Sequence, residues 1–222
     1  IPLRLVGSEM CIRDRSNFFS SAIMKTSVIS KEFKERYLSN PKHLNVFNGK
    51  AVVFEGPEDY HKRLNSKKLK IDENSILIVR GCGPVGYPGS AEVVNMQPPD
   101  RLLKKGISHL PTLGDGRQSG TSESPSILHV SPESAVGGDL GIVKTGDKMT
   151  IDLNKRRVDL LISKSEFKKR RKNKKLFKAN NQTPWQEIFR NTVGQLEDGA
   201  CINSRGRYLD VSHTKGLPRD SH

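Results

Sequence analysis

The chain has 222 residues, of which 34% are hydrophobic, enough for one domain with an apolar core. It contains no apolar run of about 18 residues, which excludes a transmembrane helix. Cys11, Cys82 and Cys201 form no Cys-x-x-Cys pair, so we expect neither a disulfide framework nor a local zinc site, and a reducing, cytoplasmic location fits. The net charge of +14 indicates a nucleic acid, an anionic membrane surface, anionic substrates or simply a basic tail.

Residues 1–15 do not begin with Met and lack the uninterrupted apolar core of a signal peptide. They resemble translated sequencing-adapter sequence, so we expect a non-native leader in front of a natural chain that is cut upstream. Cys11 then has no function. We expect one domain over residues 16–163, with a basic helix and C-terminal tail over residues 164–222 packed on it.

Local patterns predict the elements of the first half. Apolar residues at helical spacing, a Gly-Pro start followed by acids, and an N-cap at Ser90 indicate helices, whereas continuous apolar runs such as Ser-Ile-Leu-Ile-Val-Arg indicate strands. We predict helices over 27–38 and 57–64, a helical turn over 90–96, a short helix over 101–105, and strands over 51–54 and 75–80.

The run Gly81–Gly86, Gly-Cys-Gly-Pro-Val-Gly, has the G-x-G-x-x-G form that follows a strand in dinucleotide-binding folds. Its context argues against that function, because Pro84, Pro88 and Gly89 prevent a helix from starting where a pyrophosphate needs one. No second strand with an acidic end follows about 20 residues later. We therefore expect these glycines to shape a loop near a ligand.

In the second half, alternation and turn residues predict a sheet with peripheral helices. We predict strands over 108–113 and 127–130, a hairpin of 149–153 and 158–162, a helix that starts at Ser131-Pro132-Glu133 and ends at Gly137-Gly138, and a helix over 182–189 capped by Thr183 with Pro184 at its first position. The fold class is mainly β with peripheral helices (α+β), as a small barrel or sandwich.

Residues 164–178 hold nine basic residues and one acid. A nucleic-acid-binding module would use such a face, preferably with stacking aromatics, but only Phe167 and Phe177 are present. We favour a solvated basic helix and keep nucleic-acid binding as the alternative from another functional class. Salt-sensitive binding of unrelated nucleic acids would support that alternative.

The stretch Gly114–Ser122, Gly-Asp-Gly-Arg-Gln-Ser-Gly-Thr-Ser, is the densest in reactive groups. Its glycines allow close approach of backbone N–H groups to a ligand, and Arg117 can grip a carboxylate or pair with Asp115. A plain polar turn between two strands is the alternative. His129, close to the Ser131 cap, is interpreted as a packing or capping residue.

This stretch and the run Tyr87–Glu92, Tyr-Pro-Gly-Ser-Ala-Glu, resemble the C-terminal part of the dihydroxy-acid and phosphogluconate dehydratase family, in particular its sugar-acid branch of arabinonate and xylonate dehydratases. The resemblance extends from about Asn17 to His222. It implies a small swivelling β-barrel domain, the C-terminal part of a two-domain dehydratase.

The resemblance also implies an activity: removal of water from a sugar acid, an aldonate such as arabinonate or xylonate, to give a 2-oxo-3-deoxy acid. Ser119 matches the base that takes the C2 proton, and Glu92 matches a magnesium ligand. A [2Fe–2S] cluster takes the C3 hydroxyl in this family. The cluster ligands and most Mg ligands are expected in a missing N-terminal domain, so this chain alone is expected to be inactive, and the complete enzyme to be a homodimer or homotetramer.

For substrate binding we select Arg117, Thr121, Ser122 and, because the family resemblance makes an ordered tail near the site plausible, His222. Two other enzymes stay open. One is the dihydroxy-acid dehydratase of branched-chain amino-acid biosynthesis, against which Gln118 argues mildly because that branch more often has Phe before the Ser. The other is phosphogluconate dehydratase.

Overall fold

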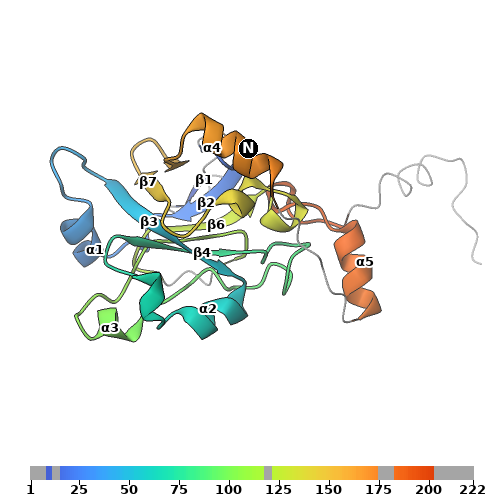
Figure 1. Cartoon of the computed structure of the whole chain (residues 1–222), viewed down its shortest axis with the longest axis horizontal. Coiled ribbons are helices and arrows are strands. Elements are labelled where there is room, and N and C mark those ends of the chain that lie inside the picture. Colours follow the sequence, from blue (N-terminus) through green and yellow to red (C-terminus); the bar gives the residue numbers. More distant parts are fainter. Residues whose placement is uncertain (1–8, 12–15, 118–121, 175–182, 203–222) are drawn as a thin grey trace, which may run out of the picture.

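The computed structural model describes residues 9–11, 16–117, 122–174 and 183–202 (Figure 1). Its strands form one mixed sheet in the order β1-β2-β6-β5-β4-β3-β7-β8. The strands are β1 (Glu9–Cys11), β2 (Ser21–Lys25), β3 (Val46–Glu55), β4 (Ser75–Arg80), β5 (Thr112–Gly114), β6 (Ser126–Ser131), β7 (Lys148–Asp152) and β8 (Arg157–Leu160).

The centre of the sheet is parallel and its flanks are antiparallel. β3, β4, β5 and β6 run in the same direction, with Val53 beside Ile78 and Ile78 beside Leu113. β7 and β8 form the predicted hairpin on one flank, and β2 with β1 forms the other. Parallel strands need crossover connections, and the segments after β3 and β4 supply them with short helices.

Two apolar cores lie on opposite faces of the central strands. Along β3 and β4, Val53 and Ile78 point into one core and Val52 and Leu77 into the other, and all four are buried. Parallel strands covered on both faces read as continuous apolar runs, which explains the Ser-Ile-Leu-Ile-Val-Arg stretch. The first core also receives the alternating apolar residues of the hairpin, since β7 and β8 bury only one face each.

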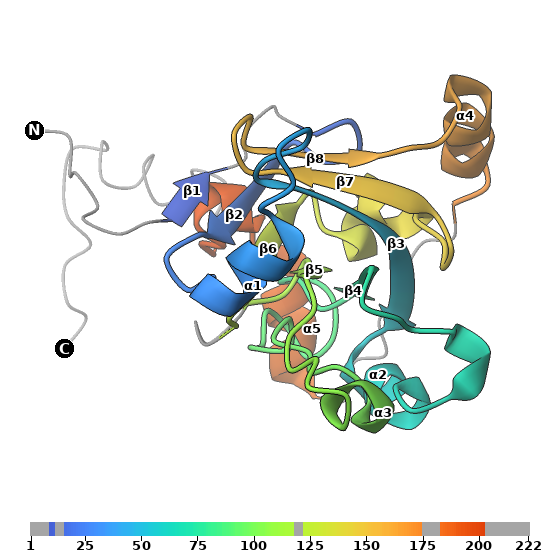
Figure 2. The same ribbon diagram turned by 90° about the vertical axis from the view of Figure 1, so that its left-hand side faces the viewer.

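The sheet curls until its two sides meet, which gives it a barrel-like form (Figure 2). Ser16, shortly before β2, forms a parallel bridge with Val158 of β8. The Asn17 side chain adds two hydrogen bonds to the same strand: its Nδ2 donates to the Leu160 carbonyl at 2.8 Å, and the Leu160 N–H donates to its Oδ1 at 2.9 Å. These bonds pair backbone groups of an edge strand that would otherwise be exposed.

Short helices surround the sheet, so the expected mainly β fold with peripheral helices is confirmed. Helices α2 and α3 lie on the side opposite α4, and α5 stands away from the sheet (Figure 1). No helix in the described part of the chain is long and apolar enough to span a bilayer. The helices are α1 (Lys31–Tyr37), α2 (Pro57–Arg63), α3 (Asp100–Leu103), α4 (Lys164–Lys172) and α5 (Pro184–Thr192), with 3₁₀ turns η1 (Lys67–Leu69), η2 (Ser134–Val136), η3 (Asp139–Ile142) and η4 (Leu196–Asp198).

Two predicted helices are wrong. Residues 90–96 form no helical turn; Ser90 has a φ of 57°, and Glu92 instead bridges to Arg117. After Ser131 the chain forms only the single turn η2, because the expected capping groups are used elsewhere. The Ser131 hydroxyl donates to the His129 carbonyl, and the Glu133 carboxylate accepts hydrogen bonds from residues 85 and 86.

Candidate active-site edge

The carboxyl ends of the four parallel strands meet at one edge of the sheet. They are Glu55 of β3, Arg80 of β4, Gly114 of β5 and Ser131 of β6. Ligands in parallel sheets bind outside this edge, where the loops that follow the strands converge. The stretch 114–122 and the Gly81–Gly86 loop, both selected from the sequence, therefore leave adjacent strands at the same edge.

A buried carboxylate, Asp115, joins the loops that follow β4, β5 and β6. Its Oδ1 accepts from the Cys82 N–H at 2.9 Å, and its Oδ2 accepts from the Gly81 N–H at 3.0 Å, the Ser134 N–H at 2.9 Å and the Ser134 hydroxyl at 2.6 Å. The residue is fully buried. Four donors around one carboxylate compensate for its burial, so Asp115 fixes the relative positions of three loops.

A second carboxylate, that of Glu133, fixes the position of the second half of the Gly81–Gly86 loop. Its carboxylate accepts from the Val85 N–H at 2.9 Å and the Gly86 N–H at 3.0 Å, and from the Gln195 side chain at 2.9 Å. Burial is the main influence on this group and raises the pKa of Glu133 above its ordinary value.

The glycines of this loop are explained by these contacts. A Cβ at Gly83 would lie 2.3 Å from the Glu133 Oε2, and a Cβ at Gly86 would lie 2.2 Å from the Gly81 carbonyl oxygen. The N–H groups that would hold a pyrophosphate in a dinucleotide site donate here to Asp115 and Glu133. The G-x-G-x-x-G spacing thus reflects packing around two carboxylates, in agreement with the rejection of dinucleotide binding.

Glu92 and Arg117 lie side by side at this edge. The Arg117 N–H donates to the Ala91 carbonyl at 2.9 Å, and the Val94 N–H donates to the Arg117 carbonyl at 3.0 Å, so the two segments pair like short strands. The Arg117 guanidinium donates through Nε to the Ser90 carbonyl at 2.6 Å. Of the two alternatives for this side chain, the structure therefore does not show the pair with Asp115.

The remaining selected residues fall partly outside the described chain. Ser119, Thr121 and His222 lie outside the described residues. Ser122 is buried at the base of the loop, where its hydroxyl donates to the Ser124 carbonyl at 3.3 Å. His129 lies in β6, and its N–H donates to the Gly116 carbonyl at 3.0 Å.

The described residues supply few ligands for a metal. Among them, no group of three or more His, Cys, Asp or Glu side chains lies close enough together to hold a metal ion. Cys82 is buried, and burial raises the pKa of its thiol, which keeps it protonated. Glu92 is exposed, and its side chain has no hydrogen bond or ion pair with the described residues, so its carboxylate is open to a ligand.

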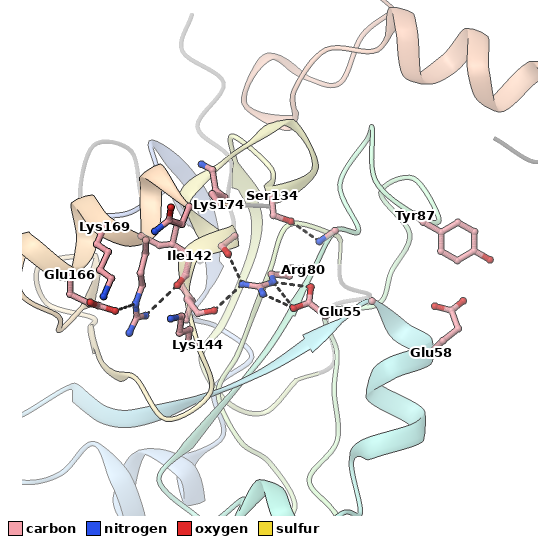
Figure 3. A pocket seen from close by; sticks show the side chains of 16 residues that line it. Glu55, Glu58, Arg80, Tyr87, Ser134, Ile142, Lys144, Glu166, Lys169 and Lys174 are labelled. Atoms are coloured by element: carbon pink, nitrogen blue, oxygen red, sulfur yellow. Dashed lines mark hydrogen bonds and ion pairs between the residues drawn. The ribbon is translucent and has the colours of Figure 1, made fainter. Parts of the chain in front are cut away.

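Sequence reasoning missed a cavity of about 550 Å³ at the ends of β3 and β4 (Figure 3). Arg80 crosses its floor, bound to the Glu55 carboxylate and to the carbonyls of Leu140, Gly141 and Val143. Helix α4 forms one wall of this cavity. Its Arg170 pairs with Asp147, with 2.5 Å between the guanidinium nitrogen and the carboxylate oxygen. The predicted solvated basic helix thus packs one side on the domain. The sequence feature that could have singled out Arg170 on this helix is the single acid, Glu166, which lies four residues before it and pairs with it.

The barrel-like mixed sheet gathers the loops of its parallel strands at one carboxyl edge, where the exposed Glu92 lies on a segment paired with that of Arg117. The chain belongs to the dihydroxy-acid/6-phosphogluconate dehydratase family, whose C-terminal profile matches residues 15–200. The family resemblance stated from the sequence is thereby confirmed.

The chain is similar to several curated dehydratases. It is 53% identical to the D-xylonate dehydratase of Caulobacter vibrioides over 208 residues, which cover 94% of this chain and 35% of the relative. It is 49% identical to the L-arabinonate dehydratase of Rhizobium leguminosarum bv. trifolii over 58% of this chain and 22% of the relative. A dihydroxy-acid dehydratase of Thermodesulfovibrio yellowstonii is 35% identical over 82% of this chain and 30% of the relative. The matched part of the chain thus spans between about a fifth and about a third of the length of these relatives.

Proposed function

We propose that this chain is the C-terminal domain of a sugar-acid dehydratase, which converts an aldonate such as xylonate or arabinonate to its 2-oxo-3-deoxy acid. The observation that carries the proposal is the 53% identity to a D-xylonate dehydratase over nearly the whole chain. The geometry supports it, because Glu92 and Arg117, one matched to a metal ligand and one selected for substrate, lie on paired segments of the same edge.

In this proposal Ser119 takes the proton from C2 of the substrate. In the sequence, Ser119 follows Arg117 by two residues. A serine hydroxyl is a weak base, so it needs positive charge nearby to stabilise its ionised form. Arg117 grips the substrate carboxylate, while Thr121 and His222 are assigned to the remaining substrate contacts. Ser122 supports the base of the loop instead, since its buried hydroxyl donates to the Ser124 carbonyl.

Magnesium, when bound, supplies positive charge beside the substrate carboxylate as the enolate develops. The described residues fit this ion in one respect: Glu92 offers a hard, exposed oxygen ligand, and Mg²⁺ accepts few protein ligands. They do not fit a [2Fe–2S] cluster, since Cys82 is buried with a raised pKa and Cys201 is exposed and distant in sequence. We assign the cluster ligands and the other Mg ligands to the N-terminal domain of a cytoplasmic homodimer or homotetramer.

The test uses the complete enzyme, recovered by extending the coding sequence upstream of Asn17 and purified anaerobically. Formation of 2-oxo acid is measured from a panel of aldonates and from dihydroxyisovalerate. We expect turnover of an aldonate that Ser119→Ala abolishes while the cluster spectrum persists. The control is Ser108→Ala, an exposed serine before β5, which is expected to leave turnover unchanged.

Other outcomes contradict parts of the proposal. Turnover of dihydroxyisovalerate alone would assign the enzyme to branched-chain amino-acid biosynthesis, and full activity of Ser119→Ala would remove this residue as the base. The 222-residue chain alone is expected to show neither turnover nor a stoichiometric iron–sulfur spectrum. Such a spectrum from the isolated chain would refute the assignment of the cluster ligands to the N-terminal domain.

A further inference from the structure

Helix α5 exposes a stripe of large apolar side chains, Trp185, Ile188 and Phe189. Their exposed fractions are 79%, 53% and 37%. Positions i, i+3 and i+4 lie on one face of a helix, so the three side chains form a continuous surface. The helix start is fixed by the Thr183 hydroxyl, which accepts from the Gln186 N–H at 3.2 Å. A single exposed apolar residue is ordinary, whereas an aromatic stripe of this kind marks a contact surface.

The stripe lies next to the candidate active-site edge. A guanidinium nitrogen of Arg190 donates to the Gly86 carbonyl at 3.4 Å, and a Cβ at Gly89 would lie 3.9 Å from the Phe189 ring. Gln195, just after the helix, holds Glu133 by two 2.9 Å hydrogen bonds, one through the backbone and one through the side chain. Helix α5 is therefore attached to the loop that leads to Glu92, three residues beyond Gly89.

The partner that covers this surface is inferred from the metal ligands that the candidate active-site edge lacks. Among the described residues, Glu92 is the candidate metal ligand, and it belongs to no group of three or more His, Cys, Asp or Glu side chains that could hold a metal ion. Under the proposed function, the further ligands must approach the same ion, which binds its ligands at about 2.0–2.1 Å. The Caulobacter relative has about two thirds of its length outside the matched region.

We propose that the α5 stripe is the docking surface for the N-terminal part of the same dehydratase, which covers the active-site edge and brings its metal ligands to Glu92. This inference rests on the proposed function. Trp185 is the central anchor, because aromatic residues buried at the centre of an interface contribute most of its binding energy. Ile188 and Phe189 extend the contact toward the Gly89 loop.

Trp185 reports directly on this contact, since it is the single tryptophan of the chain. Acrylamide quenching of its fluorescence is measured in the 222-residue chain and in the complete enzyme. In the complete enzyme the Trp185 signal is the difference between wild type and Trp185→Phe, a substitution that keeps an aromatic ring. We expect free quenching in the isolated chain at low concentration and a several-fold smaller quenching constant in the complete enzyme.

The matched control moves the reporter to the opposite edge of the sheet. Leu44 is 55% exposed and precedes β3, at the amino ends of the parallel strands. In Leu44→Trp combined with Trp185→Phe, quenching is expected to be the same in the chain and in the complete enzyme. Equal protection of both reporters would overturn the proposal, because shielding would then be general and not confined to α5.

Two further results would overturn it. One is equal quenching of Trp185 in the chain and in the complete enzyme. The other is protection in the isolated chain that grows with concentration while the mass doubles in sedimentation, which makes the stripe a self-association surface. The proposed function and the docking surface are tested separately. If Trp185 is protected from quenching but no aldonate is turned over, the docking surface stands and the proposed function fails. If an aldonate is turned over but Trp185 is quenched equally in both proteins, the proposed function stands and the docking surface fails.

Discussion

Replacing Asp115 by Asn tests whether this carboxylate holds together the loops of the candidate active-site edge. The aspartate accepts four hydrogen bonds, three on Oδ2 and one on Oδ1. Asparagine can turn its oxygen toward the three donors from Gly81 and Ser134. Its amide then faces the Cys82 N–H, which is also a donor, so one buried donor loses its partner.

The expected cost follows from these bonds. One unsatisfied buried N–H costs about 1–3 kcal/mol, and the three bonds that remain lose the additional strength of a charged acceptor, about 1 kcal/mol each. Asparagine avoids the burial of a charge, which offsets part of this loss. We expect Asp115→Asn to reduce the free energy of unfolding by about 2–4 kcal/mol, a large share of the 5–15 kcal/mol typical of a domain.

The assay is urea unfolding of the chain, followed by far-ultraviolet circular dichroism. The control is Asp100→Asn, an exposed aspartate whose Oδ2 accepts from the Asn65 side chain at 3.1 Å, for which we expect a change within about 0.5 kcal/mol. If Asp115→Asn changed stability no more than this control, the carboxylate would not be the clamp that its contacts suggest.

Two further substitutions test the same loop. For Gly86→Ala we expect the free energy of unfolding, measured by thermal unfolding, to fall by about 3 kcal/mol or more, because the new Cβ meets the Gly81 carbonyl. The control is Gly106→Ala, which has open space around the Cβ and a φ of 76° and should cost only about 1–2 kcal/mol. Equal losses in the two variants would contradict the packing explanation. Because the pKa of Glu133 is higher in the folded chain, its stabilising effect is complete below the unfolded pKa of about 4.5 and is lost as pH rises through the folded pKa. The unfolding free energy of wild type minus that of Glu133→Gln should therefore fall with rising pH, and a flat difference in urea titrations would refute the assignment.

Local signals in the sequence located several elements because their causes lie within a few residues. The apolar run 75–80 is β4, and the Thr183-Pro184 start begins α5 with the expected capping bond. The alternation around Met149 and Val158 is the β7–β8 hairpin. The family, too, was read from the two runs 87–92 and 114–122, and its C-terminal profile matches residues 15–200.

Long-range contacts decided the rest. The parallel centre of the sheet, the closure through Ser16 and Asn17, and the pairing of Glu92 with Arg117 join segments that are 14 or more residues apart. A local reading of Ser131-Pro132-Glu133 indicated a helix start, yet the Glu133 carboxylate binds backbone N–H groups 47 and 48 residues away. A buried carboxylate is stabilised more by hydrogen bonds to buried N–H groups than by a helix end in water, even when those N–H groups are distant in the sequence. Only the folded chain determines which groups are buried together.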